Sequence, residues 1–405
     1  MIDGADTGWL MTASVLVLMM TLPALGFFYG GLVQAKNILS VLFQTFAIAA
    51  LVSLLWFAFA YSEAFSGSGR WIGDLNAAFL QNAGREAVHP GTAIPESVFV
   101  MFQMTFAIIT PALIIGATVE RIKFGAVLLF SGLWLALVYA PVAHWVWGGG
   151  FLAARGVMDF AGGIVVHLTA GLSAIVAAWM LGPRLGFPRS VQPPHAPWMV
   201  MVGAAMLWVG WFGFNAGSAL KAGADAGMTM LATHLAAATA TGVWVAIEWI
   251  KYGKPSLVGA VTGTVAGLAT ITPASGFVGP LGAVALGLIG GTVCYGAVWV
   301  VKRGIKVDDA LDVLGVHGVG GALGSLLVPF MVSLGVGGVA LARPVLDQFA
   351  VQAEAVILVG IWSVAATWAI LRLVKSTTGL RIGRESEIQG LDFSSHGETG
   401  YHTGG

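Results

Sequence analysis

Long uncharged apolar runs, separated by short polar segments, dominate the chain. About 20 apolar residues are needed to cross a hydrocarbon core about 30 Å thick. Runs of that length lie near residues 7–33, 38–61, 97–119, 124–146, 160–183, 197–217, 226–247, 256–274, 279–301, 311–331 and 353–374. No charged residue occurs between Lys254 and Lys302, and the TPASG and GP motifs within 272–280 divide that stretch into two spans. The pattern predicts eleven transmembrane helices.

The composition supports this prediction. Of the 405 residues, 57% are hydrophobic and only 9% are charged, whereas charged residues make up about 25% of a typical soluble domain. The mean hydropathy is +0.87. These values predict an all-α integral membrane protein rather than a soluble domain with one anchor. The net charge is +0, so nothing indicates a nucleic-acid partner. The single cysteine, Cys294, excludes an internal disulfide framework and a zinc–thiolate site.

Basic residues are distributed unevenly between alternate loops. Fourteen of the 19 Lys and Arg residues lie in one set of loops together with the C-terminal segment, and five lie in the other set. Cytoplasmic loops carry an excess of Lys and Arg. We therefore expect the N-terminus outside and the C-terminus in the cytoplasm, which requires an odd number of spans. The start, MIDGADTGW, has no basic residue, so we expect no cleavable signal peptide.

Two segments of the chain repeat one pattern. DFAGGIVVHLTAG at 159–171 and DALDVLGVHGVGG at 309–321 both read Asp, seven residues, His, three residues, Gly. Five spans separate the two helices, and because five is odd the helices cross the membrane in opposite directions. This predicts an inverted five-helix repeat with pseudo-two-fold symmetry, over about 7–183 and 197–331, plus an extra helix at 353–374. Functional sites of such repeats lie at their interface near mid-membrane.

The repeat places two histidines at similar depth. With a rise of about 1.5 Å per residue, His167 and His317 each lie about 12 Å inside the end of their own helix. In a core about 30 Å thick their heights then differ by only about 6 Å, so that the imidazoles can touch. Ionisable side chains inside a membrane are costly and are functional candidates by default. The acids at the N-termini of these helices are expected to cap main-chain amides. They are Asp159, Asp308, Asp309 and Asp312.

Two facing imidazoles can ligate haem or a metal, shuttle protons in an enzyme, or line a narrow pore. Small residues around both histidines favour close packing over a haem slot. No third metal ligand and no nucleophile is evident at membrane depth, so we expect no metal, no cofactor and no enzyme. A pore remains. Aromatic residues suit a pore for a small cation, because an indole face stabilises a desolvated cation by roughly 1–2 kcal/mol or more. An ordinary aromatic belt at the membrane surface is the alternative. The candidates are Phe102, Phe106, Trp147, Phe214 and Ser218.

At these residues the chain resembles the ammonium transporter family, and within the Amt, Mep and Rhesus superfamily it resembles the Amt branch. The resemblance covers nearly the whole chain. It rests on FFYGGLVQAKN (27–37), FQMTFAIITPALI (102–114), HWVWGGG (144–150), DFAGGIVVH (159–167), GWFGFNAGS (210–218), VDDALDVLGVHGVGG (307–321) and GLRIGRESEIQGLDFSSHGE (379–398). Two positions differ from the family pattern: Gly163 stands where Ser is common, and Leu314 where Phe is usual.

The resemblance implies roles for single residues. Phe102, Phe106, Trp147 and Ser218 would recruit ammonium at an outer site. Phe106 and Phe214 would form a stacked gate below that site. His167 and His317 would line the pore and relay protons. Asp159 would be the acid that supports the recruitment site.

The resemblance also implies an architecture and partners. Residues 1–375 would form the transporter domain of a homotrimer, multi-pass in the inner (plasma) membrane, with one pore per subunit. Residues 376–405 would form a cytoplasmic regulatory tail that docks a PII-type signalling protein, with His396 and His402 on its surface. Ammonium would lose its proton and pass the pore as ammonia. Two alternatives stay open: an ammonium sensor with little flux, and an electroneutral channel for ammonia or carbon dioxide.

Overall fold

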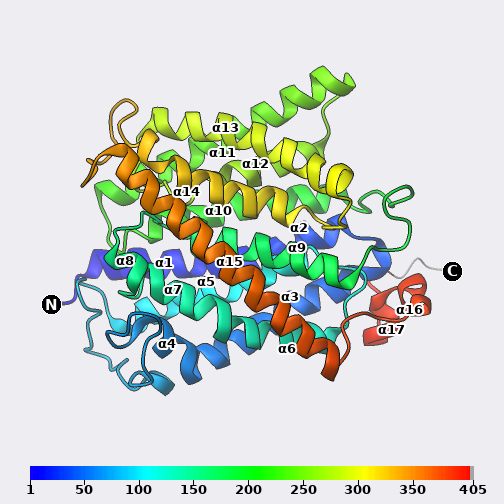
Figure 1. Cartoon of the computed structure of the whole chain (residues 1–405), viewed down its shortest axis with the longest axis horizontal. Coiled ribbons are helices and arrows are strands. Elements are labelled where there is room, and N and C mark those ends of the chain that lie inside the picture. The colour runs from blue at the N-terminus through cyan, green and yellow to red at the C-terminus, as the bar shows by residue number, and fades with distance from the viewer. Residues whose placement is uncertain (402–405) are drawn as a thin grey trace.

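The computed structural model describes residues 1–401 and is helical throughout its core. Most of the long helices run along the long axis of the molecule, and the N-terminus lies at the opposite end from the two short helices near residues 384–396 (Figure 1). Ten helices in the described residues are long and apolar enough to cross a membrane, and a shorter apolar helix covers Leu257–Ile271. Each of the eleven predicted runs therefore coincides with a helical span. The prediction of an all-helical membrane protein is confirmed.

The first six spans are built from short and long helical pieces. They comprise α1 (Gly4–Met19), η1 (Met20–Leu25) and α2 (Gly26–Leu32); η2 (Ala35–Asn37), α3 (Ile38–Leu55), η3 (Trp56–Ala60) and α4 (Tyr61–Phe65); α5 (Glu96–Ile115); α6 (Phe124–Trp134), η5 (Leu135–Tyr139), α7 (Ala140–Val146) and α8 (Phe151–Ala154); η6 (Gly163–Leu168) and α9 (Thr169–Leu181); and α10 (Pro197–Gly217). A short 3-10 turn, η4 (Ala78–Leu80), lies in the loop between the second and third spans.

The remaining spans and the tail follow the same plan. They comprise α11 (Ala224–Tyr252); α12 (Leu257–Ile271); α13 (Pro280–Trp299) and η7 (Val300–Ile305); η8 (Leu314–Gly318) and α14 (Val319–Met331); α15 (Val345–Thr377); and the tail helices α16 (Arg384–Gln389) and α17 (Leu391–His396). The TPASG segment ends α12, and Pro280 begins α13. The predicted break in the long uncharged stretch is thus confirmed.

Both predicted histidines lie in π-helical turns, η6 and η8, which begin the spans completed by α9 and α14. These two spans approach each other where glycines replace side chains. A Cβ atom on Gly171 would lie 2.3 Å from the Cα of Gly318, and one on Gly321 would lie 2.4 Å from the carbonyl oxygen of Gly163. Only glycine permits such backbone contact. The crossing brings the two π-helical turns side by side.

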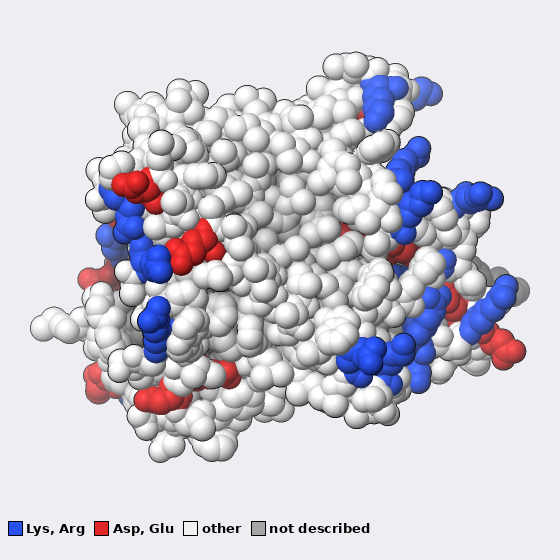
Figure 2. Space-filling view, viewed as in Figure 1, with Lys and Arg blue, Asp and Glu red and all other residues white. Residues whose placement is uncertain are grey.

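On the face of the molecule shown in Figure 2, charged side chains gather at the two ends. Figure 2 shows an uncharged band across its middle, with Lys and Arg gathered at the end that carries the tail and a mixture of acidic and basic residues at the other end. The band has the character expected of a surface in contact with lipid.

The tail is folded against the body. Lys36 Nζ donates to the carbonyl oxygens of Glu387 and Ile388, and the main-chain amide of Ser40 donates to the Asp392 carboxylate. His396, expected on the surface, is partly buried: its ring packs edge-on against Phe43 and Phe124, with centroids 5.0 and 5.2 Å away. His402 lies outside the described residues.

Candidate functional site

The two histidines meet in the interior, as predicted. The Nδ1 atoms of His167 and His317 are 3.3 Å apart, and the ring centroids are 5.2 Å apart. The rings are 1% and 5% exposed. A hydrogen bond between two neutral imidazoles needs one protonated and one bare Nδ1, so the neighbours decide which ring donates.

Thr272 decides the tautomers. Its hydroxyl donates to the carbonyl oxygen of Leu268 at 2.7 Å, and its oxygen accepts the Trp211 indole N–H at 2.8 Å. His167 Nε2 lies 3.4 Å from the same oxygen. Because the hydroxyl proton is already engaged, Thr272 can only accept from His167. His167 therefore carries its proton on Nε2, and its bare Nδ1 accepts from His317 Nδ1–H. His317 Nε2 is then an acceptor, and it makes no hydrogen bond within residues 1–401.

Asp159 holds the turn that carries His167. One carboxylate oxygen accepts the main-chain amides of Gly162 and Gly163 at 3.0 and 2.6 Å. The other accepts those of Ile164 and Val165 at 2.9 and 3.1 Å. Four otherwise orphaned donors at the start of η6 are satisfied by a single side chain. The predicted capping role of Asp159 is confirmed.

The second repeat has a smaller version of this cap. Asp309 accepts the main-chain amides of Val313 and Leu314 at 3.0 and 2.7 Å, at the start of η8. Burial and the nearby charge of Asp312 raise the pKa of Asp309 to about 7. The prediction that Asp309 caps the helix of His317 is confirmed.

The capping prediction is wrong for Asp308 and Asp312, because arginine and lysine side chains take their carboxylates. Asp308 accepts from the main-chain N–H, Nε and Nη2 of Arg184 at 2.8, 3.0 and 3.0 Å. Burial would raise the pKa of Asp308, but the hydrogen bonds and charge of Arg184 lower it below its ordinary value. Asp312 pairs with Lys302 at 2.7 Å.

Aromatic rings form a continuous column above the histidines. Trp147 contacts Phe106 edge to face with centroids 6.0 Å apart, and Phe106 stacks on Phe214 at 4.2 Å with an interplanar angle of 24°. Phe214 stacks in turn on His167 at 5.9 Å. Beside the histidines a cavity of about 10 Å³ remains, which is about the space of one water molecule. The column is closed to a hydrated ion.

A cavity of about 290 Å³ lies at the Trp147 end of the column, and we call it the aromatic vestibule. Its lining residues are Phe65, His89, Phe99, Gln103, Phe106, Val146, Trp147, Phe160, Ser218 and Leu220. The Trp147 indole N–H donates to the carbonyl oxygen of Asp159 at 2.9 Å, which fixes the indole. Ser218 donates to the carbonyl oxygen of Phe214 at 2.9 Å, so its oxygen faces any guest as an acceptor.

The structure brings three of the four predicted recruitment residues together, namely Phe106, Trp147 and Ser218. Phe102 does not line the vestibule: it is fully buried, and its ring packs behind Phe106 with centroids 4.9 Å apart. The face of α5 that reaches the vestibule carries residues 99, 103 and 106. Sequence reasoning missed Phe99 and Gln103, although the spacing i, i+4, i+7 marks one helix face.

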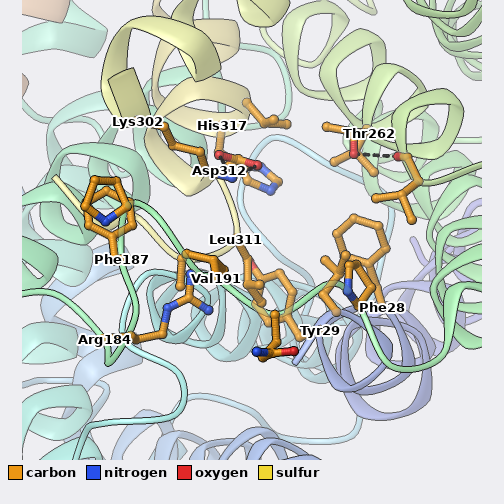
Figure 3. Close-up of a pocket in the computed structure, with 18 of the residues that line it drawn as sticks. Phe28, Tyr29, Arg184, Phe187, Val191, Thr262, Lys302, Leu311, Asp312 and His317 are labelled. Carbon is orange, nitrogen blue, oxygen red and sulfur yellow. Dashed lines mark hydrogen bonds and ion pairs between the residues drawn. The ribbon is translucent and has the colours of Figure 1, made fainter. Parts of the chain in front are cut away.

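A second cavity, of about 410 Å³, lies at the His317 end of the column, and we call it the tail-side vestibule. Figure 3 shows charged side chains, Arg184, Lys302 and Asp312, around this cavity together with His317. Arg184 is held by Asp308 and by Glu120, at 2.9 Å from the latter. Both vestibules have aromatic residues in their lining, but only the lining of the tail-side vestibule includes Lys, Arg and Asp side chains.

No group of three His, Cys, Asp or Glu side chains within residues 1–401 is arranged to hold a metal ion. The 3.3 Å contact between the imidazole nitrogens leaves no slot for a flat cofactor between the rings. The side chains of the site offer cation–π faces, hydrogen-bond acceptors and a pair of imidazoles.

Residues 8–401 match the model of the Ammonium Transporter Family. A putative ammonium transporter of Methanothermobacter thermautotrophicus is 46% identical over 409 residues, with 99% of each chain covered. An ammonium transporter of Bacillus subtilis is 42% identical, with 98% of each chain covered. The crystal structure of Saccharomyces cerevisiae Mep2 is 34% identical with a TM-score of 0.85, covering 94% of this chain and 91% of that one. A structure of a sensor Amt protein is 30% identical with a TM-score of 0.90, covering 97% and 98%.

Proposed function

The chain belongs to the ammonium transporter family, and we propose that it moves ammonium across a membrane through the ring column, with ammonia as the species that passes the interior. The observation that carries this proposal is the column itself. It leads from an aromatic vestibule, through stacked Phe106 and Phe214, to a hydrogen-bonded histidine pair. The proposed activity is transport and not the chemical conversion of a substrate.

Recruitment takes place in the aromatic vestibule. The Trp147 indole and the Phe106 ring replace part of the hydration of ammonium, since a cation over an aromatic face is attracted by roughly 2 kcal/mol or more once it is desolvated. The Ser218 oxygen accepts one N–H of the ion. Asp159 acts through Trp147, because it fixes the turn whose backbone carbonyl holds the indole.

Deprotonation follows because the interior cannot hold an unpaired charge. A buried ion without a partner costs many kcal/mol, and the bore beside the histidines is apolar and narrow. Ammonia carries no charge and passes the Phe106–Phe214 gate. Potassium resembles ammonium in size but has no proton to lose, so the same barrier excludes it.

The histidine pair offers ammonia a directional set of hydrogen bonds. With His317 Nδ1–H donating to His167, the bare Nε2 of His317 accepts an N–H of ammonia on its way to the tail-side vestibule. A proton can cross the pair only if both rings exchange their protonated nitrogens. The released proton travels separately through the imidazoles, which makes the net process the transfer of one positive charge.

We assign the aromatic vestibule to the outer face and the tail to the cytoplasm. The concentration of Lys and Arg at the tail end supports this orientation (Figure 2). The inverted repeat is supported by the Asp-capped π-helical turns η6 and η8, which carry the two histidines at equivalent positions. Residues 1–375 form the transporter domain and 376–405 the regulatory tail.

Family membership supports two further assignments: a homotrimer with one pore in each subunit, and a PII-type protein docking on the tail. The tail is folded on the body close to the tail-side vestibule, since Glu387 accepts the main-chain amide of Leu185 at 2.8 Å, next to Arg184. A protein bound to the tail can therefore act on the inner mouth.

One experiment separates this function from its alternatives. The purified protein is reconstituted in liposomes on a solid-supported membrane, and the current is recorded after a jump in ammonium, with potassium as the control. A saturable current with ammonium alone establishes selective transport of charge. No current with a rapid internal pH rise indicates a channel for neutral ammonia. Binding without current or pH change indicates a sensor, an alternative that the similarity to the sensor Amt protein keeps in view.

A further inference from the structure

Only one side chain lining the aromatic vestibule, within the described part of the chain, is ionisable, and it is His89. It lies in the loop between the second and third spans, and its ring stacks on Phe99 with centroids 3.5 Å apart and an interplanar angle of 13°. Phe99 also lines the vestibule. The proposed transport mechanism makes no use of His89.

Glu96 fixes how His89 presents its nitrogens. The Nδ1 atom lies 2.8 Å from one Glu96 carboxylate oxygen, and the His89 and Glu96 side chains are 16% and 5% exposed. The other carboxylate oxygen accepts from Tyr61 Oη and from the Asn82 amide. Because a carboxylate only accepts, neutral His89 keeps its proton on Nδ1. Its Nε2 is then a bare acceptor, and it makes no hydrogen bond within residues 1–401.

Gln103 is the second unsatisfied group at the vestibule. The residue is 8% exposed, and its amide oxygen is shielded and has no hydrogen-bond partner among the described residues. Buried polar groups are almost always paired, so an unpaired one on a residue that lines a cavity needs an explanation. The oxygen meets a guest in the vestibule only when the side-chain amide turns from the position that it has in the structure.

We propose that His89 and Gln103 form an acceptor subsite for ammonium in the aromatic vestibule, and that protonation of His89 closes it. The subsite rests on the proposed function and extends it. Ammonium has four N–H donors, and the recruitment residues described above supply one acceptor oxygen, that of Ser218. His89 Nε2 and the Gln103 oxygen supply two more, while the Glu96 carboxylate behind His89 adds a favourable charge.

Protonation of His89 reverses this contribution. Both ring nitrogens then donate, the acceptor is lost, and a positive charge lies at the cavity wall. Glu96 faces His89 from α5, and Tyr61 faces Glu96 from α4; no other titratable side chain within residues 1–401 lines the vestibule or contacts the His89 ring. Ammonium itself stays protonated between about pH 5 and 8, so a change in its affinity over that interval reports on the protein.

The test compares His89→Gln with the wild type and with His234→Gln. Glutamine keeps an acceptor at position 89 but does not titrate. His234 is a matched control, because its ring also packs against an aromatic side chain, that of Trp208 at 5.2 Å, but it does not line the vestibule. The half-saturating ammonium concentration is measured from the transport current in liposomes between pH 5 and 8. Ammonium binding to the detergent-solubilised proteins is measured by calorimetry at the same pH values.

For the wild type and His234→Gln we expect the half-saturating concentration to rise about tenfold from pH 8 to pH 5, as expected from the loss of one hydrogen bond to a charged group. For His89→Gln we expect a flat profile. The same pH dependence in His89→Gln and the wild type would overturn the proposal. If the wild type carries no current but its calorimetric affinity follows these profiles, the subsite stands and transport fails.

Gln103→Leu supplies a second test, which distinguishes an acceptor role of Gln103 from a purely structural one. Removing an unsatisfied buried oxygen should leave the protein as stable as before or more stable. If Gln103 only fills space, the half-saturating concentration stays unchanged. If its oxygen accepts from ammonium, that concentration rises severalfold at every pH while the thermal unfolding temperature does not fall. An unchanged concentration would remove Gln103 from the subsite and contradict the proposal.

Discussion

Replacing Asp159 with asparagine removes half of the cap on the His167 turn. Each carboxylate oxygen accepts two main-chain amides, and an asparagine keeps only one oxygen, so two buried donors lose their acceptor in either orientation of the amide. An unsatisfied buried donor costs about 1–3 kcal/mol, which gives a loss of about 2–6 kcal/mol for Asp159→Asn. Asp309 caps with one amide on each oxygen, so Asp309→Asn should cost about half as much, about 1–3 kcal/mol.

Comparing Asp159→Asn with Asp309→Asn tests whether the number of capped amides sets the loss in unfolding free energy. Chemical or thermal unfolding of the purified proteins in detergent gives the two losses in unfolding free energy. Asp159→Asn should also raise the half-saturating ammonium concentration, because the turn that it loosens carries the carbonyl holding Trp147. Equal losses in the two variants, or a smaller loss in Asp159→Asn, would refute the view that the number of capped amides sets the stability of these turns.

Three further predictions concern the gate, a buried ion pair and the tail. Phe214→Ala removes the ring between Phe106 and His167 and should destabilise the protein by about 3–5 kcal/mol. It should also raise the osmotic water permeability of liposomes measured by stopped-flow light scattering, and an unchanged permeability would argue against the gate. Asp308→Asn should lower the unfolding free energy by about 3–5 kcal/mol at pH 7. Because the folded pKa of Asp308 is lowered, its ion pair with Arg184 stabilises the protein above about pH 4, and this effect is lost as the pH falls through the folded pKa. The unfolding curves of the variant and the wild type should therefore converge in acid. Glu387→Gln weakens the contacts of Glu387 with Arg381 and the Leu185 amide and should speed limited proteolysis of the tail, whereas an unchanged rate would show that these contacts do not anchor it.

The spans and the histidine pair could be predicted because the length of an apolar run identifies a span, and the position of a residue within a span gives its depth in the membrane. Twenty apolar residues without charge fit one helix across a bilayer, so each predicted run coincides with a helix. The pairing of His167 with His317 followed from two helices entering from opposite ends with their histidines at the same depth. The structure adds the cause of the close contact, which is the meeting of Gly171 with Gly318.

The roles of the acids could be predicted only where the partner was local. Asp159 and Asp309 cap amides within six residues of themselves, and sequence position suffices for such contacts. Asp308 instead binds Arg184, which is 124 residues away, and no pattern in the sequence predicts that pairing. His396 illustrates the same limit, because its contact with Phe43 and Phe124 depends on how the tail folds onto the body.

The lining of the aromatic vestibule was predicted in part for a related reason. Phe102 and Phe106 are four residues apart, but the face of α5 that meets the vestibule carries Phe106 with Phe99 and Gln103 and leaves Phe102 out. Helical spacing identifies which residues share a face and leaves open which face meets a cavity. His89 comes from a loop whose path no pattern in the sequence describes.

In the proposed mechanism ammonium gives up its proton before it enters the bore, and the histidine pair relays that proton. The most direct test measures the ammonium and potassium flux of the wild type, His167→Ala and His317→Ala in the same liposomes. We expect an ammonium current without potassium flux in the wild type, and in each variant either the loss of the ammonium current or the entry of potassium. Full ammonium transport with complete rejection of potassium in both variants would contradict the mechanism.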